Sequence, residues 1–133
     1  MIVTETTPTL LIDTDVIIDY LRDQKDAIAY FEALTETLLL SVITLAELYA
    51  GVREGTERTA LETFITAFEI VPVSETIAIK GGLYRRDFGK SYGVELADAM
   101  IAASAETRGA TLVTLNKKHF PMLSTVSVPY QKA

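Results

Sequence analysis

The chain of 133 residues contains no cysteine, so it can form neither disulfides nor thiolate metal sites. Side-chain oxygens are therefore its only dense source of metal ligands, which favours Mg²⁺ or Mn²⁺ over zinc. Its longest apolar runs, around 38–43 and 99–105, fall far short of the roughly 20 residues that span a membrane. Residues 1–9 lack the basic stretch and apolar core of a secretory signal. These absences predict a cytoplasmic protein that does not enter a membrane.

Positive charge is in the minority, with 12 Lys and Arg against 18 Asp and Glu and a net charge of −6. Proteins that coat nucleic acid nonspecifically neutralise phosphates with Lys and Arg, so the composition argues against that class. A nuclease remains compatible with this charge, because acids that converge on divalent ions are locally neutralised. The length fits one globular domain. We therefore expect a single domain over residues 1–133, with residues 1–9 as a flexible tail.

Hydrophobic periodicity predicts strands that alternate with helices. Short apolar runs indicate strands at 10–13, 37–42, 69–73, 111–115 and 124–128. Apolar residues at helical spacing indicate helices at 15–22, 25–36, 44–54, 57–69, 75–91 and between Gly93 and Gly109. This alternation predicts an α/β fold with a mainly parallel central sheet of four to five strands, covered by helices on both faces. Ligands bind beyond the carboxyl ends of such strands, where Asp13 and Asn116 fall.

Four acidic residues occupy positions where a carboxylate is costly for folding. Asp13 directly continues the apolar run LLI, and Asp15 follows at the start of the next helix. Glu47 and Asp98 lie in helical segments, and each is followed by apolar or small residues. Burial of a carboxylate costs free energy unless a partner compensates. A bound cation is the simplest such partner.

Each acid also has a structural alternative. Asp15 or Thr14 could cap the first helix, and for Asp15 considered alone capping is the favoured interpretation. Glu47 stands three residues after Thr44, the T-x-x-E spacing of a capping box, which is favoured when Glu47 is considered alone. Asp98 could complement the dipole of its helix. Separate structural roles for these acids would have to arise independently at three elements, whereas one shared site explains all of them together.

The segments LLIDTDVIIDYL, TLAELYAGV, LADAMIAA and LVTLNKKHF resemble, in order and spacing, the successive motifs of the PIN-domain ribonucleases. They are most similar to the small VapC-type toxins of type II toxin–antitoxin pairs. The similarity extends from Leu10 to Phe120. It implies a PIN-like three-layer α/β/α domain and an endoribonuclease that uses Mg²⁺ or Mn²⁺ to hydrolyse RNA. It also implies a homodimer and a cognate antitoxin, often one that presents an arginine to the carboxylates.

The resemblance gives roles to individual residues. It implies catalytic roles for Asp13, Glu47, Asp98 and Asn116, and metal binding by the three acids. Many relatives have an aspartate near Asn116, so this chain departs from the fully acidic form and would bind a second metal more weakly. The resemblance also implies supporting roles for Thr14, Asp15 and Thr114.

Two groups of basic residues are candidates for binding RNA phosphates, with a solvated surface as the alternative. The first group precedes the helix of Asp98 and comprises Arg85, Arg86 and Lys90; the second follows Asn116 and comprises Lys117 and Lys118. His119 is the only histidine. The resemblance places it in a structural or flanking role.

Two other functions compete with the nuclease. The D-T-D sequence from Asp13 to Asp15 resembles the nucleophile motif of aspartyl-phosphate phosphohydrolases, although Ile17 stands where that motif has Thr or Val. The other alternative is a catalytically silent PIN-fold module that binds a protein. RNA cleavage by wild type and by acid variants would separate these possibilities.

Overall fold

The computed structural model describes residues 8–131. Its strands are β1 (Thr9–Ile12), β2 (Thr37–Ser41), β3 (Glu69–Val71), β4 (Thr111–Val113) and β5 (Val126–Ser127). Its helices are α1 (Thr14–Leu21), α2 (Lys25–Ala33), α3 (Val42–Gly51), α4 (Thr56–Phe64), α5 (Glu75–Tyr92) and α6 (Leu96–Thr107). Two 3₁₀ turns, η1 (Ile65–Ala67) and η2 (Lys117–His119), complete the described part. Most of the predicted tail, residues 1–7, lies outside the described residues, and Thr9 already belongs to β1.

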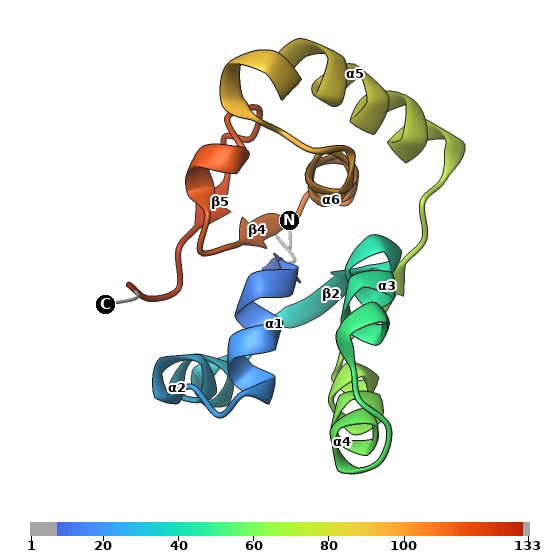
Figure 1. The fold of residues 1–133 in the computed structure, drawn as a ribbon. Helices are drawn as coiled ribbons and strands as arrows, with labels where there is room; N and C mark the ends of the chain where they lie inside the picture. The colour runs from blue at the N-terminus through green and yellow to red at the C-terminus, as the bar shows by residue number, and fades with distance from the viewer. Residues whose placement is uncertain (1–7, 132–133) are drawn as a thin grey trace, which may run out of the picture.

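The five strands form one sheet in the order β3-β2-β1-β4-β5, and all four pairings are parallel. Figure 1 shows α5 and α6 on one side of this sheet and α1, α2 and α4 on the other. The predicted three-layer α/β/α fold is therefore confirmed. Among residues 8–131, no helix is both long enough and apolar enough to cross a bilayer.

Neighbouring residues of each central strand pack on opposite faces of the sheet, which explains the continuous apolar runs. On the face that α5 and α6 cover, the core contains Leu11, Leu39 and Leu112. On the face that α1, α3 and α4 cover, it contains Ile12, Leu40 and Val113. Both faces of the central strands are therefore buried, and polar side chains can gather only beyond the strand ends.

The strand order creates a switch point between β1 and β4. The chain leaves β1 to form β2 and then β3 on one side, and it returns through α5 and α6 to place β4 on the other side. Connections that diverge in this way open a crevice at the carboxyl ends of the two strands. Asp13 directly follows β1, and Thr114 directly follows β4.

Some predicted helix boundaries were wrong. The helix predicted from Thr44 begins two residues earlier, at Val42, because the Ser41 hydroxyl accepts a hydrogen bond of 3.1 Å from the Ile43 N–H and caps it. The helix predicted to end at residue 36 ends at Ala33. By contrast, the helix predicted from residue 75 begins there, and Ser74 caps α5 with its hydroxyl 3.2 Å from the Ile77 nitrogen.

Candidate active site

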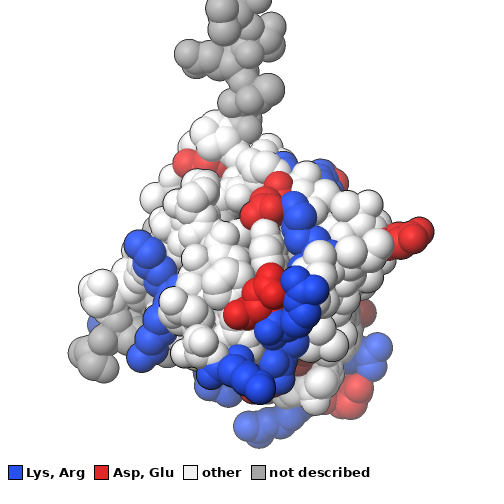
Figure 2. Space-filling model, turned by 90° about the horizontal axis from the view of Figure 1, so that it is seen from above, with Lys and Arg blue, Asp and Glu red and all other residues white. Residues whose placement is uncertain are grey.

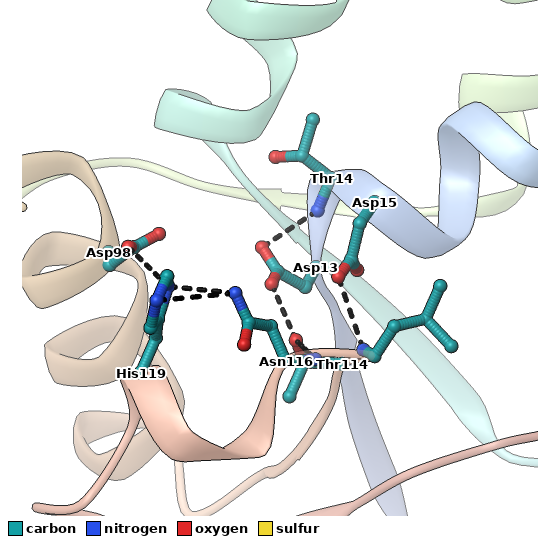
Figure 3. Close-up of polar contacts among 8 residues, drawn as sticks. Asp13, Thr14, Asp15, Asp98, Thr114, Asn116 and His119 are labelled. Carbon is teal, nitrogen blue, oxygen red and sulfur yellow. Dashed lines mark hydrogen bonds and ion pairs between the residues drawn. The ribbon is translucent and has the colours of Figure 1, made fainter. Parts of the chain in front are cut away.

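Asp13 forms the centre of a polar cluster at the switch point. It is 7% exposed, and its backbone N–H donates to the Val113 carbonyl of β4 across 2.8 Å. Both carboxylate oxygens accept hydrogen bonds of 2.8 Å, Oδ1 from the Thr14 N–H and Oδ2 from the Thr114 hydroxyl. Figure 3 shows these two bonds holding the carboxylate between the ends of β1 and β4. The orientation of Asp13 is therefore fixed from both strands.

The cap of α1 is Asp13, so the prediction that Asp15 or Thr14 caps this helix was wrong. Asp15 lies in the first turn of α1, and its Oδ2 accepts a hydrogen bond of 3.2 Å from the Leu115 N–H, just beyond β4. This contact ties α1 to the segment that follows β4 (Figure 3). Asp15 and Asp13 therefore both accept hydrogen bonds from the residues that directly follow β4.

Glu47 approaches the cluster from α3. Its Oε1 accepts a hydrogen bond of 2.7 Å from the Thr14 hydroxyl. Since Ser41 caps α3, the capping-box interpretation of Thr44 and Glu47 was wrong. The side chain of Glu47 reaches another element of the fold instead of its own helix end.

Asp98 lies in the first turn of α6 and faces the segment after β4. Its Oδ2 is 3.7 Å from Nδ1 of His119, and the Asn116 amide nitrogen is 2.8 Å from the same ring nitrogen. The Asn116 backbone N–H also donates to the Thr114 hydroxyl across 3.1 Å. His119, which the sequence placed in a flanking role, therefore lies between Asp98 and Asn116.

The electrostatics of the cluster favour protonation of Asp13 and Asp98. Burial raises the pKa of Asp13 to about 7, and repulsion from Asp15 and Asp98 adds to this effect against the hydrogen bonds from Thr114 and Thr14. Burial also raises the pKa of Asp98; His119 opposes this shift, and Glu47 adds to it. Two carboxyl groups from different elements are thus destabilised in their charged form by one shared environment. Two perturbed acids at the switch point of a parallel sheet indicate a candidate functional site.

Comparison with known protein families matches residues 10–123 to the PIN domain. The chain belongs to the PIN-domain family. It is 39% identical over 124 residues to Ribonuclease VapC19 of Mycobacterium tuberculosis, an alignment that covers 90% of this chain and 98% of the relative. It is 33% identical over 124 residues to Ribonuclease VapC10 of the same species, covering 91% and 92% of the two chains. The predicted VapC-type PIN relationship is therefore confirmed.

Solved structures of similar fold include one that is titled as a toxin–antitoxin complex. The match to "Toxin-antitoxin complex from Klebsiella pneumoniae" has a TM-score of 0.80 at 28% identity and covers 92% of this chain and 99% of the other. The match to "Crystal Structure of FitAcB from Neisseria gonorrhoeae" has a TM-score of 0.73 at 30% identity and covers 90% and 97%. The PIN fold is thus shared over nearly the whole length of these chains.

The donor set of this PIN domain fits a hard divalent cation in chemical type. The side chains of the cluster offer carboxylate, hydroxyl and amide oxygens, and the mutual repulsion of the acids would be relieved by positive charge. Within residues 8–131, no three Asp, Glu or His side chains gather closely enough to hold an ion by themselves. Mg²⁺ is one such cation, and proteins commonly bind it through a few carboxylates while it keeps several of its waters. Metal binding by Asp13, Glu47 and Asp98 remains a prediction.

The basic candidates fall into two positions on this PIN domain. Lys117 and Lys118 are exposed in η2, directly after Asn116, and so lie beside the cluster. Arg85, Arg86 and Lys90 are exposed on α5, where Arg86 forms an ion pair of 2.8 Å with Asp87. Figure 2 shows Lys and Arg gathering in the lower half of the face seen from above, interleaved with fewer acids. Because Lys117 and Lys118 lie beside the cluster, they are better placed than the α5 residues to contact RNA.

Proposed function

We propose that this chain, as one PIN-like domain over residues 1–133, is a metal-dependent endoribonuclease and the toxin of a toxin–antitoxin pair. The observation that carries the proposal is the buried Asp13 carboxylate at the β1–β4 switch point, with Asp98 on α6 near enough for its charge to raise the pKa of Asp13. Relatives at 33% and 39% identity over most of the chain are named ribonucleases. Hydrolysis of an RNA phosphodiester is the reaction that this acid cluster supports best.

We propose Asp13, Asp98 and Glu47 as the residues that hold Mg²⁺ or Mn²⁺. A divalent cation bound there would offset charge on the phosphodiester and lower the pKa of the attacking water. Thr114 and the Thr14 N–H keep the Asp13 carboxylate in one orientation, so that its position does not need to be set anew when substrate arrives. Burial raises the pKa of Asp98 and so disfavours its charged form, a cost that a bound cation would offset.

Asn116 and Asp15 complete the polar surroundings in this proposal. Asn116 occupies the fourth catalytic position, where its amide contributes no negative charge, and its nitrogen contacts His119 across 2.8 Å. Asp15 holds the segment after β4 in place through the Leu115 N–H. The phosphohydrolase alternative is less well supported, because Asp98 lies within α6 instead of at the end of a strand. The nuclease is therefore the better-supported reading.

The partners follow from the same relationship. Similar structures carry titles that describe complexes of a toxin with its antitoxin, and the acidic cluster would attract an arginine of such a partner. We propose a cytoplasmic homodimer that a cognate antitoxin holds inactive. A small protein encoded next to this chain is the partner to test: it should copurify with the chain and suppress RNA cleavage.

Cleavage of a mixed RNA pool by the purified protein tests the proposed activity. Cutting should occur with Mg²⁺ or Mn²⁺ and stop with EDTA, and a folded Asp98→Asn variant purified in the same way should be inactive. Equal cleavage by the variant would indicate a contaminating nuclease. Absence of cleavage with every metal would leave the silent binding module as the better description.

A further inference from the structure

Thr44 is a fully buried polar residue to which the proposed reaction assigns no role. It is 0% exposed and lies in the first turn of α3. Since Ser41 caps this helix, Thr44 is not needed for capping. Its hydroxyl lies 3.1 Å from the hydroxyl of Thr14 on α1. A buried hydroxyl is retained at low cost only when it is hydrogen-bonded, so this contact explains how Thr44 is accommodated.

Thr44 and Glu47 meet at the same hydroxyl. Residues three apart on a helix lie on one face, and the Thr14 hydroxyl contacts Thr44 at 3.1 Å and the Glu47 carboxylate at 2.7 Å. A hydroxyl carries a single hydrogen, so Thr14 cannot donate to both residues at once. Both contacts are satisfied when Thr44 donates to Thr14 and Thr14 donates to Glu47. In this arrangement Thr44 directs the Thr14 hydrogen towards the carboxylate.

Glu47 needs such a restraint because it is an exposed residue with a long side chain. A glutamate that is fixed in one rotamer loses conformational entropy, and a chain of hydrogen bonds strengthens each of its members. Thr14 is in turn fixed to the first acid, since its backbone N–H donates to Asp13 Oδ1 across 2.8 Å. The relay from Thr44 through Thr14 therefore sets where Glu47 lies relative to Asp13.

We infer that Thr44 is a positioning residue, which acts through the Thr14 hydroxyl to hold the Glu47 carboxylate towards the metal site. The inference rests on the proposed function, because it assumes that Glu47 contributes to binding a divalent ion. Under this inference, the T-x-x-E spacing of α3 serves the contact of Thr44 and Glu47 with Thr14 on α1, instead of helix capping. The hydroxyl of Thr44 matters for this role, whereas its methyl group serves packing.

A double-mutant cycle tests the relay, with the Mn²⁺ dissociation constant as the readout from titration calorimetry. Thr44→Val keeps the shape of the side chain and removes the hydroxyl, and it should weaken Mn²⁺ binding about three- to tenfold, the equivalent of one hydrogen bond. Thr44→Ser should bind within about twofold of wild type. In a Glu47→Ala background, Thr44→Val should change Mn²⁺ binding by less than about twofold, because the carboxylate that it positions is absent.

Ser104→Ala is the matched control. Ser104 is also 0% exposed, and its hydroxyl donates to the Met100 carbonyl across 2.8 Å within α6, so its loss should leave Mn²⁺ binding unchanged. If Thr44→Val does not fold, Thr14→Val replaces it in the cycle and should weaken Mn²⁺ binding at least as much.

Three results would overturn the positioning role: equal weakening with and without Glu47, no weakening at all, or no Mn²⁺ binding by wild type. RNA cleavage is measured separately on the same samples. If wild type does not cut RNA while the coupling between Thr44 and Glu47 persists, the nuclease proposal fails and the positioning role stands. If wild type cuts RNA without any coupling, only the positioning role fails.

Discussion

The Thr114 hydroxyl donates a hydrogen bond of 2.8 Å to Asp13 Oδ2 and so joins the end of β4 to the end of β1. Thr114 is 0% exposed, and its oxygen also accepts from the Asn116 N–H across 3.1 Å. One buried hydroxyl thus links the first acid of the cluster to the segment that carries Asn116 and His119. The proposed site depends on two strands that lie a hundred residues apart in sequence and side by side in the sheet.

The stability of the metal-free protein should fall as the pH rises from about 4 to 7. Burial raises the pKa of Asp13 from 3.8 to about 7, so the folded state binds more protons than the unfolded state in this interval. The cost of the ionised group reaches at most on the order of 4 kcal/mol above pH 7. Asp13→Asn removes this cost, keeps an acceptor oxygen for the Thr14 N–H, and places an amide nitrogen where it can donate to the Thr114 hydroxyl oxygen. In EDTA, urea unfolding should show the variant to be more stable than wild type at pH 8.

The difference between Asp13→Asn and wild type should shrink at pH 5, where Asp13 is largely protonated in the folded state. A variant that is less stable than wild type by the same amount at both pH values would show that ionisation of Asp13 carries no penalty. Other carboxyl groups contribute to the pH dependence of both proteins, so the difference between the two, rather than either curve alone, reports on Asp13.

Divalent ions should stabilise the folded protein, more at pH 8 than at pH 5.5. Metal and protons compete for the same carboxylates, so binding weakens as the acids become protonated. An ion present at 100 times its dissociation constant adds about 2.7 kcal/mol to the free energy of unfolding. The melting temperature should therefore rise by several degrees with Mn²⁺, and the rise should be much smaller in Asp98→Asn. KCl at equal ionic strength is the control, and an equal shift with KCl would refute specific binding.

Lys117 and Lys118 should contribute to RNA affinity without affecting the chemical step. Both are exposed beside the acid cluster, and each phosphate contact on a single strand adds about 0.7 to the salt dependence of binding. Changing both lysines to Ala should raise KM, leave kcat within about twofold and reduce the salt slope by about 1.4. Changing Arg53 and Arg58 to Ala removes the same charge from the α3–α4 region and should change neither KM nor the salt slope. Equal effects of the two pairs would indicate that only net charge matters.

The fold was largely predictable because its central strands are buried on both faces. Leu39 faces α5 and α6 whereas Leu40 faces the opposite helices, and a run such as LLL reflects this directly. The position of Asp13 was predictable for the same reason, since an acid that ends a buried run must lie at the end of its strand. Local sequence and tertiary burial agree at these positions.

The contacts of α3 and η2 were less predictable. A spacing of three residues places Thr44 and Glu47 on one helix face, whether they serve a capping box or contact Thr14, so the spacing alone cannot identify the partner. His119 reaches Asn116 within its own turn, but its approach to Asp98 depends on how α6 packs. Such contacts follow from packing between elements, and local sequence carries no signal for them.

Asp19 was also missed, although it is as buried as Asp13, at 7% exposure. Its Oδ2 accepts a hydrogen bond of 2.9 Å from the hydroxyl of Tyr130, near the other end of the chain. The sequence places Asp19 among the apolar positions of α1, where its partner is not apparent. Burial of an acid alone therefore does not distinguish a structural carboxylate from one in the site.

This pair of aspartates offers the most direct test of the central claim, that the Asp13 cluster is the site of RNA cleavage. Cleavage rates of Asp13→Asn and Asp19→Asn would be measured on the same RNA with saturating Mn²⁺, after both variants are shown to be folded. We expect Asp13→Asn to lose at least about 100-fold, a loss of about 2.7 kcal/mol in transition-state stabilisation, and Asp19→Asn to remain within a few-fold of wild type. Similar rates for the two variants, whether both high or both low, would contradict this account.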